Sequence, residues 1–198
     1  MTAPSDTAAI VLGAGRSERF GTQNKLLHEI DGVPVIRRTV EAVLGANLAE
    51  VIVVTGHDAD HVEPALAGLA VKCARNATPW AGMGTSLAVG ANAVKPGYSG
   101  VFVMLGDMPK LQSSTLTRML KYFDPKTGRD IAVPICNGRR GHPVLFGPRH
   151  FPQLCALSGD DGARQILKDH PERVQAVQVD DPGTLFDIDT PEDAAGAD

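Results

Sequence analysis

The chain has 198 residues, of which 43% are hydrophobic and 21% charged, and its net charge is −4. This composition is typical of a folded globular protein and excludes a largely disordered chain. The negative balance argues against a nucleic-acid-binding protein, which usually carries a basic face, and no apolar run is long enough to span a bilayer.

Neither the cysteines nor the N-terminus has the features expected of an exported protein. Cys73, Cys136 and Cys155 lie far apart without a Cys-x-x-Cys pair, so neither a disulfide framework nor a zinc ribbon is indicated. The first residues lack the basic and apolar segments of a signal peptide. We therefore expect a cytoplasmic protein, and at this length we expect residues 1–198 to form a single domain.

Short apolar strands alternate with helical segments along the chain. We expect strands at 8–12, 51–55, 71–74, 101–105, 131–136, 144–146 and 174–179, and helices at 33–44, 60–66, 85–93, 114–122 and 163–170, with a last turn at 193–197. Asn137-Gly138 is a strong hairpin signal because both residues tolerate positive φ, and the strand at 144–146 is its expected return arm. The alternation predicts an α/β protein with a mainly parallel sheet covered on both faces.

The first strand leads into a glycine-rich loop at residues 12–25. The loop contains three glycines and three cations: Gly13, Gly15, Gly21, Arg16, Arg19 and Lys25. Glycine lets the backbone approach a ligand closely, and backbone amides with clustered positive charge suit a polyphosphate. A Walker A loop is excluded because Leu26 follows Lys25, and the dinucleotide fingerprint is excluded because Glu18 replaces its third glycine. An exposed turn with solvated charges is the plainer alternative.

Two acidic motifs are expected at the same edge of the sheet. Asp107 directly follows a strand, and ligands of open α/β sheets bind beyond the carboxyl ends of the strands. Asp187 and Asp189 lie two residues apart on extended chain and so point the same way. Carboxylates here could hold Mg²⁺, with Asp107 as first ligand, Asp189 next and Asp187 after it. A plain turn would also explain Asp107, and a capping box with Thr190 explains Asp193.

Two further segments have simple structural explanations. The stretch 80–87 looks like a glycine turn feeding a helix, with Thr85 or Ser86 as its N-cap. His57 and His61 have a spacing that could bind a transition metal. Asp60 between them suits the N-cap of the next helix, and we do not expect a metal there.

Four blocks in order carry a family resemblance: residues 12–27, Gly106-Asp-Met-Pro109, Gly138-Arg-Arg-Gly-His-Pro143 and Asp187-Ile-Asp-Thr-Pro-Glu-Asp193. They resemble molybdenum cofactor cytidylyltransferases, relatives of the molybdopterin guanylyltransferases. The segment 157–164 also looks like part of that subfamily. The similarity covers nearly the whole chain and implies a three-layer, Rossmann-like nucleotidyltransferase fold. Gly13 is a departure, since that branch more often has alanine there.

The resemblance implies that the terminal phosphate of molybdopterin attacks the α-phosphate of CTP and releases pyrophosphate. It implies catalytic roles for Lys25, Arg19 and Asp107, with Mg²⁺ or Mn²⁺ held by Asp107, Asp189 and Asp187. The implied nucleotide-binding residues are Leu12, Gly13, Ala14, Gly15, Arg19, Lys25, Gly82, Gly84, Ser86 and Asp107. The acceptor is expected at Arg139, Arg140, Gly141 and His142, presented at the site mouth by the Asn137-Gly138 hairpin.

CTP and molybdopterin are the expected partners, and the recipient molybdoenzyme or its chaperone is a further candidate; neither a nucleic acid nor a membrane is expected. Guanylyl-transferring relatives carry glycine where this chain has Ala14, and the methyl group would narrow the space for a purine. Three alternatives remain open. They are a GTP-using molybdopterin guanylyltransferase, a sugar-phosphate nucleotidyltransferase, and a carrier that holds the molybdenum cofactor without turning it over.

Overall fold

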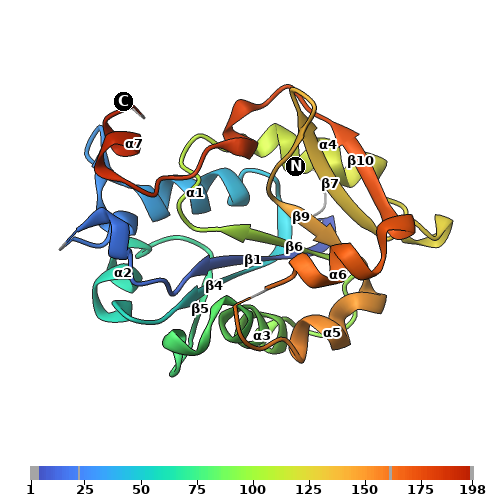
Figure 1. The fold of residues 1–198 in the computed structure, drawn as a ribbon, viewed down its shortest axis with the longest axis horizontal. Helices are drawn as coiled ribbons and strands as arrows, with labels where there is room; N and C mark the ends of the chain where they lie inside the picture. Colours follow the sequence, from blue (N-terminus) through green and yellow to red (C-terminus); the bar gives the residue numbers. More distant parts are fainter. Residues whose placement is uncertain (1–4, 22, 161, 197–198) are drawn as a thin grey trace.

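A computed structural model describes residues 5–21, 23–160 and 162–196. The strands of its central sheet are β1 (Ser5–Gly13), β4 (Leu48–Thr55), β5 (Lys72–Arg75), β6 (Gly100–Leu105), β7 (Ile131–Cys136), β8 (Arg139–Arg140), β9 (Val144–Phe146) and β10 (Val174–Gln178). They are ordered β10-β7-β9-β6-β1-β4-β5, and β8 pairs with β7 (Figure 1). A separate hairpin joins β2 (Glu29–Ile30) to β3 (Val33–Pro34).

The central sheet is mainly parallel, which confirms the predicted fold class. β1 runs parallel to β4 and β6, β4 to β5, and β7 to β10. β9 is antiparallel to both β6 and β7, so these two strands also share one direction. The carboxyl ends of β1, β4 and β6 therefore lie at one edge of the sheet, where the loops that follow them can meet.

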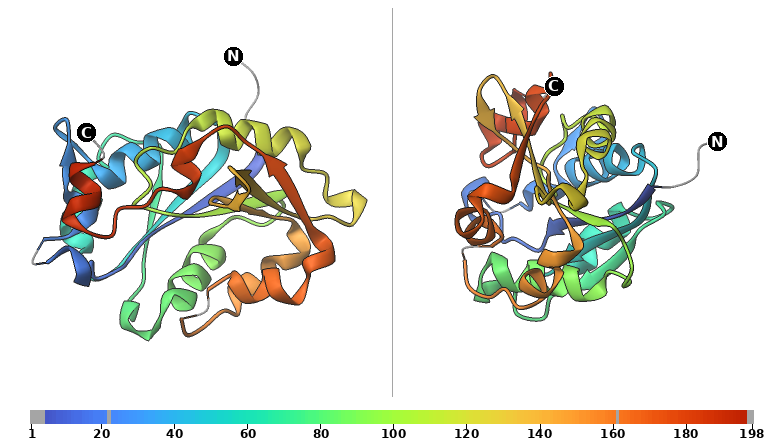
Figure 2. Two further views of the ribbon diagram at one scale, coloured as in Figure 1. Left: turned by 45° about the horizontal axis from the view of Figure 1, so that its top comes forward. Right: turned by 90° about the vertical axis from the view of Figure 1, so that its right-hand side faces the viewer.

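Helices cover both faces of this sheet. α1 (Val35–Leu44), α2 (Ala59–Ala65) and α4 (Ser113–Tyr122) supply the core on one face, and α3 (Met83–Ala93), α5 (Phe151–Cys155) and α6 (Arg164–Asp169) supply it on the other. Figure 2 shows the two helical layers with the sheet between them. α7 (Pro191–Ala195) packs through Ala194 against Phe20 and Ile30. In the described ranges no helix combines the length and apolar character needed to cross a bilayer.

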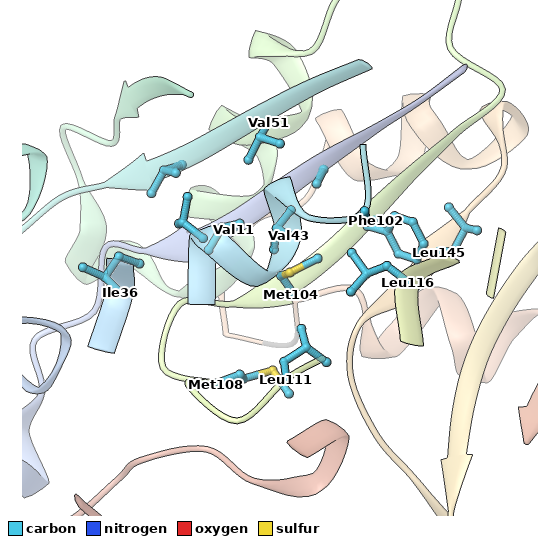
Figure 3. Close-up of a cluster of buried hydrophobic side chains, with 14 of the residues drawn as sticks. Val11, Ile36, Val43, Val51, Phe102, Met104, Met108, Leu111, Leu116 and Leu145 are labelled. Carbon is cyan, nitrogen blue, oxygen red and sulfur yellow. The ribbon is translucent and has the colours of Figure 1, made fainter. Parts of the chain in front are cut away.

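Alternating side chains of each strand enter the two cores. Val11 on β1 lies in one core with Val43 of α1 and Met104 of β6 (Figure 3). Ile10, one residue earlier, lies in the other core with Leu87 of α3. Successive side chains of a strand point to opposite faces, so a strand covered on both sides appears in sequence as a continuous apolar run.

Several predicted boundaries differ from the structure. α1 begins two residues later than expected, because the predicted helix start at 33–34 forms β3. α7 begins at Pro191 and ends at Ala195, with the capping box between Thr190 and Asp193 confirmed; residue 197 of the expected turn lies outside the described residues. α5 was not predicted, because five residues are too few to show a helical period.

The predicted turn and caps have mixed outcomes. Asn137 and Gly138 have φ of 49° and 74°, as a tight hairpin turn requires. The immediate return arm is β8, while β9 pairs with the start of β7. The N-cap of α3 is Gly82, without a side-chain hydrogen bond, so the predicted hydroxyl cap is wrong. Asp58, and not Asp60, occupies the N-cap position of α2.

Candidate active site

A cleft of about 730 Å³ opens at the carboxyl edge of the sheet, where β1 and β6 end. Segments distant in sequence meet in it: 12–17 with Arg19, 25–26, residues of 79–86, Leu105 with Asp107, Asp160 with Arg164, and Asp187 with Asp189. The predicted site residues that line the cleft are Leu12, Gly13, Ala14, Gly15, Arg19, Lys25, Gly82, Ser86, Asp107, Asp187 and Asp189. The topology thus brings together most of the nucleotide and metal residues expected from the sequence.

Lys25 lies at the centre of the charged groups in the cleft. Its Nζ is 2.5 Å from Oδ2 of Asp107 and 2.8 Å from Oδ1 of Asp189. Arg19 binds the other oxygen of Asp189, with Nη1 2.8 Å from Oδ2. One lysine therefore joins the loop after β1 to both acidic motifs.

The backbone fixes the two acidic motifs relative to each other. Gly106 donates a backbone hydrogen bond to Leu12, and a Cβ on Gly106 would lie 2.9 Å from the carbonyl oxygen of Leu12. Glycine is therefore required for the chain to leave β6 this close to β1. The next residue, Asp107, accepts a backbone hydrogen bond from Ile188 at 3.0 Å, which brings Asp187 and Asp189 to the same end of the cleft.

Burial and charge shift the titration of these groups in different directions. Burial raises the pKa of Asp107 above its ordinary value, although the nearby ammonium of Lys25 opposes this shift. Burial alone would lower the pKa of Lys25, but Asp107 and Asp189 together raise it. The hydrogen bond from Lys25 lowers the pKa of Asp189, which is also more exposed. The cluster therefore favours a charged lysine beside an ionised Asp189, while burial favours the protonated form of Asp107.

The acidic cluster fits a divalent cation. Asp107, Asp187 and Asp189 each offer an oxygen within 4.8 Å of the others, and no other such group of three or more His, Cys, Asp or Glu occurs among the described residues. The Oδ1 atom of Asp107 is buried without a hydrogen-bond partner. A buried carboxylate oxygen without a partner is costly, and a bound cation would satisfy it. Carboxylate oxygens are the ligands that Mg²⁺ and Mn²⁺ prefer.

Asn24 braces the glycine-rich loop, a role that the sequence did not indicate. Its Oδ1 accepts hydrogen bonds from the Ser17 hydroxyl and the backbone N–H of Leu26, and its Nδ2 donates to Asp58 at 3.2 Å. Asp58 also contacts His61 at 2.5 Å. The histidine-rich segment after β4 thus supports the loop that carries Lys25.

A second wall of the cleft is built around Asn76, which follows β5. Its Nδ2 donates to the buried hydroxyl of Ser86 at 2.9 Å. Gly84 donates its N–H to Gly159 at 2.7 Å, and a Cβ on it would lie 2.6 Å from the carbonyl oxygen of Ser158. Gly84 is buried and does not line the cleft. Close packing against 158–159 explains why glycine is needed at this position, without a contact to the nucleotide.

The predicted acceptor block does not line the cleft. Arg139 and Arg140 are exposed on the β7–β8 hairpin. Gly141 packs tightly against the chain before Asp187, since a Cβ on it would lie 2.3 Å from the Thr184 carbonyl oxygen. His142 donates its backbone N–H to that same oxygen at 2.9 Å. The predicted block therefore has two parts: Arg139 and Arg140 are exposed at the hairpin, and Gly141 and His142 are packed against the chain at Thr184.

Some cleft residues were not among the predicted site residues. They include Arg16, Ser17, Leu26, Pro79, Trp80, Met83, Leu105, Asp160 and Arg164. Trp80 and Met83 are 65% and 50% exposed, and they flank the glycine turn that the sequence did single out. Exposed large apolar side chains beside a cleft are a sign of ligand contact. Asp160 and Arg164 could only have been suspected from the subfamily block at 157–164.

Residues 9–174 match the family described as the MobA-like NTP transferase domain. The purine catabolism protein PucB of Bacillus subtilis is 31% identical over 195 residues, covering 93% of this chain and 92% of that protein. The bifunctional protein GlmU of Agrobacterium fabrum is 38% identical over 128 residues, which are 63% of this chain. This match spans only 28% of the length of GlmU.

Solved structures agree with the family match. A nucleotidyl transferase from Methanothermobacter thermautotroptrophicus, Mth528, superimposes with a TM-score of 0.83 at 29% identity over 96% of this chain and 95% of its own. Rv0371C of Mycobacterium tuberculosis, in a complex with manganese, gives a TM-score of 0.79 at 26% identity over 96% of both chains. The manganese complex is consistent with a divalent cation at an acidic cluster in this fold.

Proposed function

Because the chain belongs to the MobA-like NTP transferase family and is a nucleotidyltransferase, we propose that it transfers CMP from CTP to the terminal phosphate of molybdopterin in the cytoplasm. The observation that carries the proposal is the position of Lys25, between Asp107 and Asp189 at the end of the glycine-rich loop. Charge of both signs at the carboxyl edge of the sheet suits a metal-assisted reaction of a triphosphate.

The proposed reaction is a single displacement. An oxygen of the acceptor phosphate forms a bond to the α-phosphorus of CTP, and the bond from that phosphorus to the oxygen leading to the β-phosphate breaks. Pyrophosphate leaves with the electron pair, and the product is a dinucleotide joined by a pyrophosphate linkage. No covalent intermediate with the protein is needed, so the protein contributes positioning and charge stabilisation.

Different residues of the cleft would bind the phosphates, stabilise the developing charge and hold the metal ion. The backbone of the glycine-rich loop and Arg19 would hold the β- and γ-phosphates, and Lys25 would stabilise negative charge on the α-phosphate during transfer. Asp107 and Asp189, with Asp187, would hold Mg²⁺ or Mn²⁺, which when bound neutralises phosphate charge. Lys25 would then exchange part of its contact with the carboxylates for contact with the nucleotide.

Nucleotide choice is proposed to depend on the wall at Ala14. This residue is 4% exposed and lines the cleft beside Pro79. Its methyl carbon would lie 2.8 Å from a Cβ placed on Gly56, so Ala14 is packed closely against Gly56 and has little space to move away from a bound base. A cytosine fits such a wall more readily than the larger guanine, which supports CTP as the substrate.

The test is release of pyrophosphate from CTP and Mg²⁺ with molybdopterin as acceptor, compared with GTP, ATP and UTP, and with a sugar phosphate as acceptor. We expect release with CTP and the pterin, and its loss in Lys25→Ala. Faster release with GTP would replace CTP by GTP in the proposal. Release with the sugar phosphate alone would reassign the acceptor. Tight pterin binding without any release would favour a carrier.

A further inference from the structure

Two cations of the glycine-rich loop are paired with carboxylates, whereas the side chain of Arg164, on another segment of the cleft, is not. Arg19 and Lys25 both bind carboxylates of the acidic cluster. Arg164, the first residue of α6, also lines the cleft, but its guanidinium makes no hydrogen bond or ion pair with any residue in the part of the chain that the structure describes. A cation that faces a substrate cleft without a protein partner is suited to bind an anionic group of a ligand.

The segment before Arg164 is fixed to the wall of the cleft. Gly159 accepts the backbone hydrogen bond of Gly84 at the start of α3. A Cβ on Gly82 would lie 2.3 Å from the carbonyl carbon of Gly159, and one on Gly84 would lie 2.6 Å from the oxygen of Ser158. The two glycines therefore let the chain at 158–159 pack against α3, a few residues before α6 begins.

Arg164 supplies the positive charge at this wall. Its charge acts on His142, a largely buried imidazole that also feels the charge of Asp187. Burial lowers the pKa of His142; Asp187 opposes this shift, and the positive charge of Arg164 adds to it. Arg139 and Arg140 lie on the exposed hairpin and do not line the cleft.

The in-line geometry of the reaction indicates which wall of the cleft binds the pyrophosphate and which binds the acceptor. In-line displacement requires the attacking oxygen and the leaving pyrophosphate to lie on opposite sides of the α-phosphorus. If the glycine-rich loop holds the pyrophosphate, the acceptor phosphate must approach from another wall. Arg164 belongs to such a wall, since it comes from α6 and not from the loop after β1.

We propose that Arg164 binds the phosphate monoester of the acceptor and orients it for attack, an inference that rests on the proposed function. A guanidinium presents two parallel N–H groups to a phosphate, which gives both attraction and orientation. Arg139 and Arg140 would contribute only long-range attraction of the anionic acceptor from outside the cleft.

The test is steady-state pyrophosphate release with CTP and Mg²⁺ at varied molybdopterin. Arg164→Ala is expected to raise the KM for the pterin roughly tenfold to a hundredfold, with the KM for CTP unchanged. Arg164→Lys should recover part of the loss, because it keeps the charge and loses the paired N–H groups. Lys168→Ala is the matched control, since this exposed cation of the same helix does not line the cleft.

A binding measurement separates this inference from the proposed function. Calorimetric titration of molybdopterin into the nucleotide-free protein should show weaker binding to Arg164→Ala than to the wild type. Equal binding, or a KM change for CTP in place of the pterin, would overturn the role of Arg164 while leaving nucleotidyl transfer intact. A wild type that neither binds the pterin nor uses it in pyrophosphate release would overturn both.

Discussion

Two buried aspartates at opposite edges of the sheet have different surroundings. Asp107 follows β6 and is 7% exposed, and Asp130 precedes β7 and is 3% exposed. Since β6 and β7 run in the same direction, the two carboxylates lie at the carboxyl and amino edges respectively. Burial of a carboxylate is costly at either edge unless it is paired.

The partners of the two carboxylates explain why only one belongs to a site. Asp130 contacts His150 at 3.1 Å, Arg173 at 3.4 Å and Arg149 at 3.6 Å. Burial alone would raise its pKa, but His150 and Arg173 lower it below the ordinary value. Asp107 has a raised pKa and one oxygen without a partner. A buried carboxylate whose partners are complete stabilises the fold, whereas an incomplete one is a candidate for ligand binding.

Replacing each aspartate by asparagine should give opposite results. Asp107→Asn is expected to lower kcat by about 10³-fold or more, because metal-assisted charge stabilisation is lost, with little loss of thermal stability. Asp130→Asn is expected to keep kcat while lowering the free energy of unfolding by about 1–3 kcal/mol. Pyrophosphate release and thermal unfolding, measured on both variants, test the comparison. It fails if Asp107→Asn stays active or if Asp130→Asn loses activity while folded.

Lys25→Ala tests whether the lysine and the cation share the charge of Asp107. We expect kcat to fall by about 10²-fold or more, since Lys25 meets charge that develops in the transition state. Removing the lysine also leaves Asp107 without its ion pair, so the melting temperature in chelator should fall. Added Mn²⁺ should then raise the melting temperature more in Lys25→Ala than in the wild type. An equal or smaller rise would contradict a shared site.

Replacements of Asp187 and Asp189 should differ in their effect on activity. Asp189→Ala is expected to lower activity by about 10²-fold and Asp187→Ala by about tenfold, because Asp189 also binds Arg19 and Lys25. Calorimetric Mn²⁺ affinity should fall in the same order. A larger effect of Asp187→Ala would reverse the assignment of these two residues within the acidic cluster.

The comparison also indicates what the sequence could predict. Buried parallel strands give apolar runs, so β1, β4, β6 and β7 were expected at close to their observed positions. Asp107 follows β6 closely, Lys25 belongs to the loop after β1, and Asp189 precedes α7; the first two come together because β1 and β6 are neighbours in the sheet. Short elements such as α5 and the β2–β3 hairpin give no periodic signal and were missed.

The remainder of the site depends on tertiary contacts. The sequence shows that Arg139 and Arg140 follow a hairpin turn, but not toward which side the hairpin points, and they lie outside the cleft. Arg164 follows a segment, 158–159, that packs against Gly84, a contact between segments about seventy residues apart in the sequence. Neither pattern nor spacing contains that contact.

Stability measured against pH should separate the two aspartates once more. The lowered pKa of Asp130 means that its contribution to stability is complete above the ordinary pKa and is lost as pH falls through the folded value. The stability gap between wild type and Asp130→Asn should therefore stay constant at neutral and mildly acidic pH and narrow below about pH 4. The raised pKa of Asp107 has the opposite sign, so Asp107→Asn should gain stability relative to wild type as pH rises above about 4. Parallel trends in the two variants would contradict the assignment.

The smallest expected effect concerns the wall at Ala14, at the same edge as Asp107. Ala14 is 4% exposed, and its methyl carbon would lie 2.8 Å from a Cβ placed on Gly56, so the residue presents only a small face to the cleft. A side chain at position 13 would point toward the core instead, since a Cβ on Gly13 would lie 3.3 Å from the Val54 carbonyl oxygen and 3.4 Å from Leu26. Nucleotide choice should therefore respond to position 14.

Ala14→Gly is expected to raise kcat/KM for GTP relative to CTP by about 1 kcal/mol, the low end of what one methyl group contributes. The absolute kcat/KM for CTP should change little, because the methyl group excludes a purine and does not bind the pyrimidine. The matched measurement is kcat/KM for both nucleotides in wild type and Ala14→Gly at saturating pterin. A variant with an unchanged ratio would show that the base is read elsewhere in the cleft, for example by the wall that carries Trp80. A wild type that prefers GTP would show that the Ala14 methyl does not exclude the purine.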